Sequence, residues 1–177
     1  SAGSSLPGVR LLNVHVLGGP KMMRAAATAR DNSGLPKAHR PKLLGVTILT
    51  SMDNAALRAV GIVGPASRRV VKLARLAQQA GLDGVVASPQ EIRAIRRACG
   101  KGFLIVVPGI RPEVGENQGR TKKWKVDDQA RIATPTEAIR DGADYLVIGR
   151  PITAAPNPEA AARAILDEID SALRDQA

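Results

Sequence analysis

The stretch Gly81-Leu82-Asp83-Gly84-Val85-Val86-Ala87-Ser88-Pro89-Gln90-Glu91 contains the pattern that decides the fold. Its first glycine ends a helical segment, and a short apolar run follows. Ser88 and Glu91 then have the Ser-x-x-Glu spacing of a capping box, with a proline at the first helical position. The stretch therefore predicts a buried strand at residues 85–87 that leads directly into a helix.

The same order of strand, loop and helix recurs along the chain. Strands are expected at residues 11–16, 43–49, 85–87, 103–107 and 145–148, and a second capping box begins at Thr134. This alternation predicts an α/β fold with parallel strands joined by right-handed crossovers. Two architectures fit, an open doubly wound sheet and part of a closed (β/α)8 barrel. The length of 177 residues favours the open sheet, because barrels typically need about 200 residues or more. The sequence lacks the GxGxxG and GxxxxGK[ST] motifs of the commonest nucleotide-binding open sheets.

The composition indicates one globular domain, residues 1–177. Hydrophobic residues make up 44% of the chain, but there is only one Trp, one Tyr and one Phe. The core must therefore be built from Ala, Val, Leu and Ile, as in parallel strands covered by helices. The single cysteine, Cys99, cannot form an internal disulfide, which favours a reducing, cytoplasmic setting. No apolar run approaches the roughly 18 residues of a membrane span, so no membrane partner is expected.

The net charge of +10 raises the question of an anionic partner. Two groups of basic residues are interpreted as solvated helix faces: Arg68, Arg69, Lys72 and Arg75 in one, and Arg93, Arg96 and Arg97 in the other. Trp124 is the one aromatic residue within a basic segment. A single ring makes a weak platform for stacking single-stranded nucleic acid, so no nucleic-acid partner is expected.

Two loops that follow predicted strands carry a glycine close to an arginine. They are Val107-Pro108-Gly109-Ile110-Arg111-Pro112 and Ile148-Gly149-Arg150-Pro151-Ile152. Glycine lets backbone N–H groups approach an anion, and arginine can bind phosphate through two hydrogen bonds. Each loop alone could also be a tight turn with a surface arginine. In a barrel, however, the loops after the last two strands often bind phosphate, so the pair predicts a phosphate site.

Several motifs occur together in an order that resembles a known family. They are Asn13-Val14-His15 before Gly18-Gly19, Leu49-Thr50-Ser51-Met52, Gly81-Leu82-Asp83-Gly84-Val85-Val86, Pro108-Gly109-Ile110-Arg111-Pro112, Asp128-Gln129-Ala130-Arg131 before Thr134-Pro135, and Val147-Ile148-Gly149-Arg150-Pro151-Ile152-Thr153. Over about residues 9–173, this set resembles the C-terminal part of bacterial orotidine 5'-monophosphate decarboxylases. The resemblance implies a (β/α)8 TIM barrel, of which this chain contains about the last five β/α units. It also implies decarboxylation of orotidine 5'-monophosphate to uridine 5'-monophosphate in de novo pyrimidine biosynthesis.

The resemblance also implies roles for individual residues. Arg150 and the amide of Gly149 would hold the 5'-phosphate, and Arg111 would close the same region. Gln129 matches the lid glutamine that bridges phosphate and pyrimidine, and the turn Thr50-Ser51 matches the one that contacts the pyrimidine. The family uses no metal and no cofactor. Its members are usually homodimers that share an active site across their interface.

The sequence departs from the family at the catalytic segment. None of its lysines lies in an Asp-x-Lys-x-x-Asp segment, so no catalytic residue is predicted in this chain. Residues 1–6 look like the end of the helix after the family's third strand, and the missing N-terminal strands are expected upstream of Ser1. Two alternatives therefore stay open: a non-catalytic phosphate- or nucleotide-binding fragment, and a related sugar-phosphate decarboxylase. The loop of residues 113–126 is longer and more basic than the family's lid, with Gln118 as a second candidate for the lid glutamine.

Three further residue sets have side chains that could take part in chemistry. His15, at the end of a predicted strand, is either an acid or base or a hydrogen-bonded polar residue. Cys99 has no obvious activating partner, so a reactive thiol is not expected. Asp127 and Asp128 are adjacent carboxylates without further ligands, so they do not predict a metal site.

Overall fold

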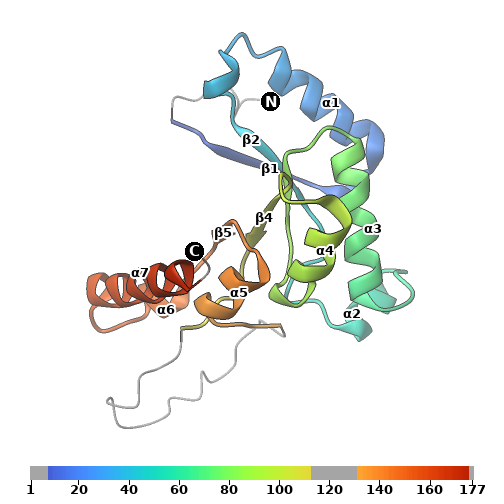
Figure 1. The fold of residues 1–177 in the computed structure, drawn as a ribbon. Helices are drawn as coiled ribbons and strands as arrows, with labels where there is room; N and C mark the ends of the chain where they lie inside the picture. Colours follow the sequence, from blue (N-terminus) through green and yellow to red (C-terminus); the bar gives the residue numbers. More distant parts are fainter. Residues whose placement is uncertain (1–7, 113–130, 176–177) are drawn as a thin grey trace.

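The fold is a parallel sheet with helices, seen in a computed structural model that describes residues 8–112 and 131–175 (Figure 1). The five strands are β1 (Leu11–His15), β2 (Lys42–Val46), β3 (Gly84–Val86), β4 (Leu104–Val107) and β5 (Tyr145–Leu146). Each strand pairs in parallel with the next one in the chain, in the order β1-β2-β3-β4-β5. A doubly wound sheet would reverse its order at a switch point, so the open-sheet alternative is wrong. The sequential order is that of part of a barrel wall.

Helices connect the strands and follow the last one. They are α1 (Gly19–Asp31), α2 (Asn54–Ala59), α3 (Ala66–Gln79), α4 (Ile92–Cys99), α5 (Pro135–Asp141), α6 (Arg150–Thr153) and α7 (Pro158–Arg174), with 3-10 turns η2 (Val16–Gly18), η3 (Lys37–His39) and η4 (Pro89–Glu91). Helices α1, α3, α4, α5 and α7 each contact the next in that series. Every strand is thus followed by at least one helix, which agrees with five β/α units.

The two predicted capping boxes differ in outcome. At α5, Thr134 Oγ1 accepts from Glu137 N at 3.1 Å and Glu137 Oε2 accepts from Thr134 N at 2.9 Å, which confirms the prediction. At the other site, Ser88 Oγ accepts from Gln90 N at 3.3 Å and begins a 3-10 turn. The carboxylate of Glu91 pairs with Arg131 instead of the helix end. The capping-box prediction was wrong there, because a guanidinium distant in sequence competes for the carboxylate.

Strands β2 and β5 are shorter than the apolar runs that predicted them. Strand β2 ends at Val46, where its pairing with Val86 of β3 ends. The next residue, Thr47, donates from both its backbone N and its Oγ1 to Val86 O, at 3.2 and 2.9 Å. Strand β5 ends at Leu146, paired with Val107. Apolar runs predict burial, but the length of a strand depends on where its neighbour ends.

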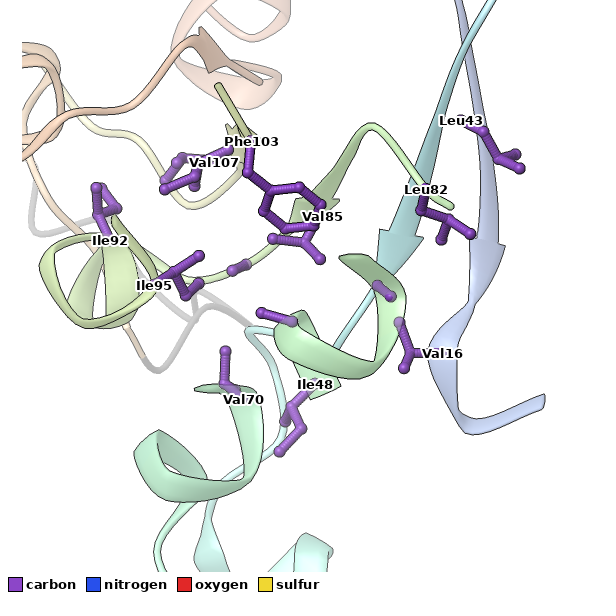
Figure 2. Packing of buried hydrophobic residues seen from close by; sticks show 14 of the residues in the cluster. Val16, Leu43, Ile48, Val70, Leu82, Val85, Ile92, Ile95, Phe103 and Val107 are labelled. Carbon is purple, nitrogen blue, oxygen red and sulfur yellow. The ribbon is translucent and has the colours of Figure 1, made fainter. Parts of the chain in front are cut away.

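The core lies between the sheet and the helices. Residues Val14, Gly45, Val85 and Ile105 are aligned across β1 to β4, and their face of the sheet packs against the helices. Figure 2 shows side chains of the strands and of α3 and α4 converging in this layer, among them Val70, Val85, Ile92, Ile95 and Val107. The only aromatic side chain in this cluster, Phe103, is 4% exposed. The expectation of an aliphatic core is confirmed.

Two aspartates repeat the same arrangement at the amino edge of the sheet. Asp83, just before β3, accepts from Leu43 N at 2.8 Å and pairs with Arg30. Asp144, just before β5, accepts from Ile105 N at 2.7 Å and pairs with Arg96, also at 2.7 Å. In both cases a carboxylate caps the start of the preceding strand and pairs with an arginine from the helix before that strand. Each aspartate thus joins two strands and a helix.

Arg96 corrects one prediction about surface charge. Arg68, Arg69, Lys72 and Arg75 are exposed on α3, as expected. The side chain of Arg96 is only 18% exposed and donates to the carbonyls of Gly100, Lys101, Phe103 and Gly142 as well as to Asp144. Its interpretation as a solvated residue was wrong, because the turn after α4 and the end of α5 bring these carbonyl groups around its guanidinium group.

Candidate functional site

The loop after β4 is held in place by its own backbone. Gly109 has a φ of +78°, a conformation that favours glycine. Ile110 forms a parallel bridge with Ala133, in which Arg111 N donates to Ala133 O at 2.9 Å and Ala133 N donates to Gly109 O at 3.3 Å. The Arg111 residue is 9% exposed, and its Nη1 donates to Ile110 O at 2.9 Å. The predicted phosphate residue Arg111 is therefore largely buried at the base of this loop.

The loop after β5 contains the second glycine and arginine. Gly149 precedes α6 and its carbonyl accepts from Ile152 N and Thr153 N, at 2.9 and 3.0 Å. A Cβ atom added at Gly149 would have no heavy atom within 4 Å, so packing does not require glycine here. Arg150 is exposed as the first residue of α6. Because β4 and β5 are neighbours, the two glycine–arginine loops follow adjacent strand ends.

The predicted pyrimidine contacts lie in a turn after β2. Met52 N donates to Leu49 O at 3.0 Å, and this bond closes a turn with Thr50 and Ser51 at its centre. Thr50 is buried and Ser51 is exposed. The turn leads into α2, whose N-cap Asp53 accepts from Ala56 N at 2.8 Å. Strand β3 separates β2 from β4, so this turn does not adjoin the glycine–arginine loops through strand pairing.

One buried ion pair at this edge of the sheet was missed by the sequence interpretation. Arg131 Nη1 lies 2.7 Å from Glu91 Oε1, and the two side chains are 10% and 2% exposed. Arg131 Nη2 also donates to Leu49 O at 3.1 Å, the carbonyl that closes the Thr50-Ser51 turn. No local signal could have identified this pair, because its members are 40 residues apart and Glu91 was assigned to a helix cap.

Several predictions fall on residues that the structure does not describe. Gln129, the alternative Gln118, the loop of residues 113–126 with Trp124, and Asp127 and Asp128 all lie outside residues 8–112 and 131–175. Within those residues, no group of three or more His, Cys, Asp and Glu side chains is placed to hold a metal ion. No helix in the same part of the chain is long and apolar enough to cross a membrane.

Two candidate chemical groups lie away from the glycine–arginine loops. His15 is exposed at the carboxyl end of β1, at the far side of the sheet from β5. Cys99 ends α4 and is partly buried, and this burial raises the pKa of its thiol. A raised pKa leaves less thiolate near neutral pH, which agrees with the expectation of an unreactive thiol.

Comparison with known proteins shows which family this chain resembles. Residues 3–165 match the model of the orotidine 5'-phosphate decarboxylase / HUMPS family. The orotidine 5'-phosphate decarboxylase of Geotalea uraniireducens is 55% identical over 162 residues, which are 92% of this chain and 63% of that protein. The enzyme of the same name from Moorella thermoacetica is 54% identical over 165 residues, 92% of this chain and 62% of the relative. The chain therefore spans somewhat less than two thirds of the length of these curated relatives.

Solved structures agree with the sequence comparison. The crystal structure of orotidine 5'-phosphate decarboxylase from Lactobacillus acidophilus has a TM-score of 0.73 and 37% identity, over 92% of this chain and 64% of that one. A conserved protein from Geobacillus kaustophilus, described as uncharacterized, has a TM-score of 0.70 and 35% identity over the same shares. The sheet order, the paired loops and these similarities lead to one conclusion: the chain belongs to the orotidine 5'-phosphate decarboxylase / HUMPS family.

Proposed function

We propose that this chain supplies the phosphate and pyrimidine contacts of an enzyme that decarboxylates orotidine 5'-monophosphate to uridine 5'-monophosphate. The observation that carries the proposal is the pair of glycine–arginine loops at the carboxyl ends of β4 and β5. In barrel enzymes this edge carries the active site, and the loops after the last two strands often bind phosphate. Family membership supplies the substrate class.

The proposed phosphate site combines one exposed and one buried arginine. Arg150 offers a guanidinium group at the surface, next to the backbone of Gly149, which has open space around its Cα. Arg111 contributes positive charge from within the neighbouring loop. Binding energy from a phosphate that does not react can be used to orient the pyrimidine and to stabilise the transition state. Gln129, as the residue that joins phosphate and pyrimidine, stays a prediction.

Isothermal titration calorimetry tests the proposal, with 6-hydroxyuridine 5'-monophosphate and uridine 5'-monophosphate as ligands of the chain. We expect saturable binding of both nucleotides and weaker binding of uridine, which lacks the phosphate. The titration is repeated with the longest form of the protein that its gene encodes. Absence of nucleotide binding by both forms would contradict the proposal.

One observation favours a second function, that of a phosphate or nucleotide binder without catalysis. The sequence contains no Asp-x-Lys-x-x-Asp segment, so none of its lysines is predicted to stabilise the carbanion-like centre of the decarboxylation. This function would be supported if the longest form that the gene encodes binds the nucleotide but releases no carbon dioxide from orotidine 5'-monophosphate. Ribose 5-phosphate binding as tight as that of the nucleotide would point to a sugar-phosphate decarboxylase.

The proposal also covers the domain organisation, the oligomeric state and the cellular compartment of the protein. One buried cluster extends from α1 to α5, which supports treating the chain as a single domain. A cytoplasmic homodimer is proposed from the family resemblance, and light scattering of the purified protein measures its mass in solution. A monomer at all concentrations would contradict the dimer and leave the nucleotide site unaffected.

A further inference from the structure

Arg131 joins three loops at the carboxyl edge of the sheet. Its Nη1 is 2.7 Å from Glu91 in the segment after β3, and its Nη2 donates to Leu49 O after β2, at 3.1 Å. Two residues further on, Ala133 exchanges backbone hydrogen bonds with Gly109 and Arg111 in the loop after β4. The residue therefore connects the proposed pyrimidine turn to the proposed phosphate loop.

The contact between Arg131 and Leu49 matters because the Leu49 carbonyl also closes the Thr50-Ser51 turn. The same oxygen accepts from Met52 N and from Arg131 Nη2, so the guanidinium group holds the carbonyl that closes the Thr50-Ser51 turn. Many turns of this kind lack the closing hydrogen bond, so the bond is not needed for the chain to reverse its direction. A charged donor holds the Leu49 carbonyl in one orientation, because hydrogen bonds from ionised groups are stronger than those between neutral groups, and in that orientation the oxygen also accepts from Met52 N.

The buried ion pair between Glu91 and Arg131 carries a large desolvation cost. Both partners are at least nine-tenths buried, and Glu91 Oε2 and Arg131 Nε have no hydrogen-bond partner among the described residues. Buried ion pairs often contribute little stability relative to apolar residues of the same size, since both charges lose their hydration. A role in orienting neighbouring groups explains why charged side chains occupy this place.

We infer that Arg131, held by Glu91, is a positioning residue that orients the Thr50-Ser51 turn for recognition of the pyrimidine. It touches no substrate atom in this role and acts through the Leu49 carbonyl. The inference rests on the proposed function for the identity of the ligand. Its structural part, the closed turn, is independent of any ligand.

The first measurement is amide hydrogen exchange in the ligand-free protein. Arg131→Met should accelerate exchange at the Met52 amide about tenfold, because the carbonyl that accepts its hydrogen bond is no longer held in place by the guanidinium group. Arg93→Met is the matched control, since Arg93 pairs with Asp141 at 2.6 Å on the surface, far from the turn in sequence. Unchanged exchange at Met52 in Arg131→Met would overturn the inference whatever the protein binds.

The second measurement compares uridine 5'-monophosphate with ribose 5-phosphate, which has the phosphate and sugar but no pyrimidine. Arg131→Met should bind the nucleotide about tenfold more weakly and ribose 5-phosphate unchanged. Equal affinities for the nucleotide in variant and parent protein would overturn the inference. If the parent protein binds neither ligand, the proposed function itself fails, which the exchange experiment distinguishes from a failure of the positioning role.

A double variant separates positioning from stability. Glu91→Met with Arg131→Met replaces the buried charges by an apolar pair and should melt at a higher temperature than Arg131→Met alone. Fast exchange at Met52 and weak nucleotide binding should persist in it, because the Leu49 carbonyl still lacks its charged donor. Recovery of nucleotide affinity together with stability would show that Arg131 only neutralises Glu91, and would overturn the inference.

Discussion

At the residue scale, Arg96 is a helix residue predicted to be solvated whose side chain instead holds several backbone segments together. Its guanidinium group donates to four backbone carbonyls and to Asp144. We expect Arg96→Met to lower the free energy of unfolding by about 2 to 4 kcal/mol, since several acceptors lose a charged donor. Urea denaturation measures the change. Arg97→Met, at an exposed position on the same helix, should change it by less than about 0.5 kcal/mol, and equal effects of the two would contradict this role.

Cys99 allows a test of pH dependence at one side chain. Burial raises the pKa of its thiol, and only partial compensation comes from the positive charges of Arg75 and Arg96. The folded protein should therefore react with iodoacetamide more slowly than the urea-unfolded protein at pH 7 to 8, because less thiolate is present. The difference should close as the pH rises above the raised pKa. A ratio of rates that is constant with pH would indicate shielding of the sulfur in place of a shifted pKa.

At the scale of one element, α5 depends on the capping box at Thr134. The side chains of Thr134 and Glu137 each accept a hydrogen bond from the other residue's backbone N–H, and Gly142, with a φ of +101°, caps the helix after Asp141. Thr134→Ala should cost about 1 kcal/mol of stability, as is typical of a lost N-cap. Thr28→Ala, at an exposed position within α1, is the matched control and should be neutral or slightly stabilising. Thermal denaturation of both variants checks this, and equal melting temperatures would contradict the cap.

The elements were predictable where their signals are local. Apolar runs located the five strands of the described residues, and Thr134 with Glu137 located the start of α5. The lengths of β2 and β5 were overestimated, because pairing with a neighbour sets the end of a strand and the neighbour is distant in sequence. Ser88 and Glu91 satisfied the spacing of a capping box, yet Glu91 pairs with Arg131. Local spacing shows which bond is possible, and the competing partner is found only in three dimensions.

At the scale of the whole molecule, the arrangement of the two glycine–arginine loops makes a prediction about ligands. Arg150→Ala should weaken binding of uridine 5'-monophosphate by about 2 to 3 kcal/mol, roughly a hundredfold, because a charged donor to phosphate is lost. Binding of uridine should hardly change. Calorimetric titration of both ligands measures the difference. Arg163→Ala, which removes an exposed arginine paired with Glu159 on α7, is the control. Equal losses for nucleotide and nucleoside would place the phosphate elsewhere.

The sequence alone determined the α/β class, the order of the β/α units, the family resemblance and the two glycine–arginine loops. These follow from residues that are close together in the chain, where burial periodicity, caps and short motifs act. The family resemblance already implied a barrel, whereas periodicity and length left the open sheet possible. The sequential strand order that excludes the open sheet is a property of neighbours in space and was seen only in the tertiary structure. The tertiary structure alone revealed the pairing of Glu91 with Arg131 and the carbonyl groups around Arg96. The physical reason is that a buried charge is stabilised by whatever groups the fold brings within a few ångströms of it, and the arginine that pairs with Glu91 is 40 residues away in the chain.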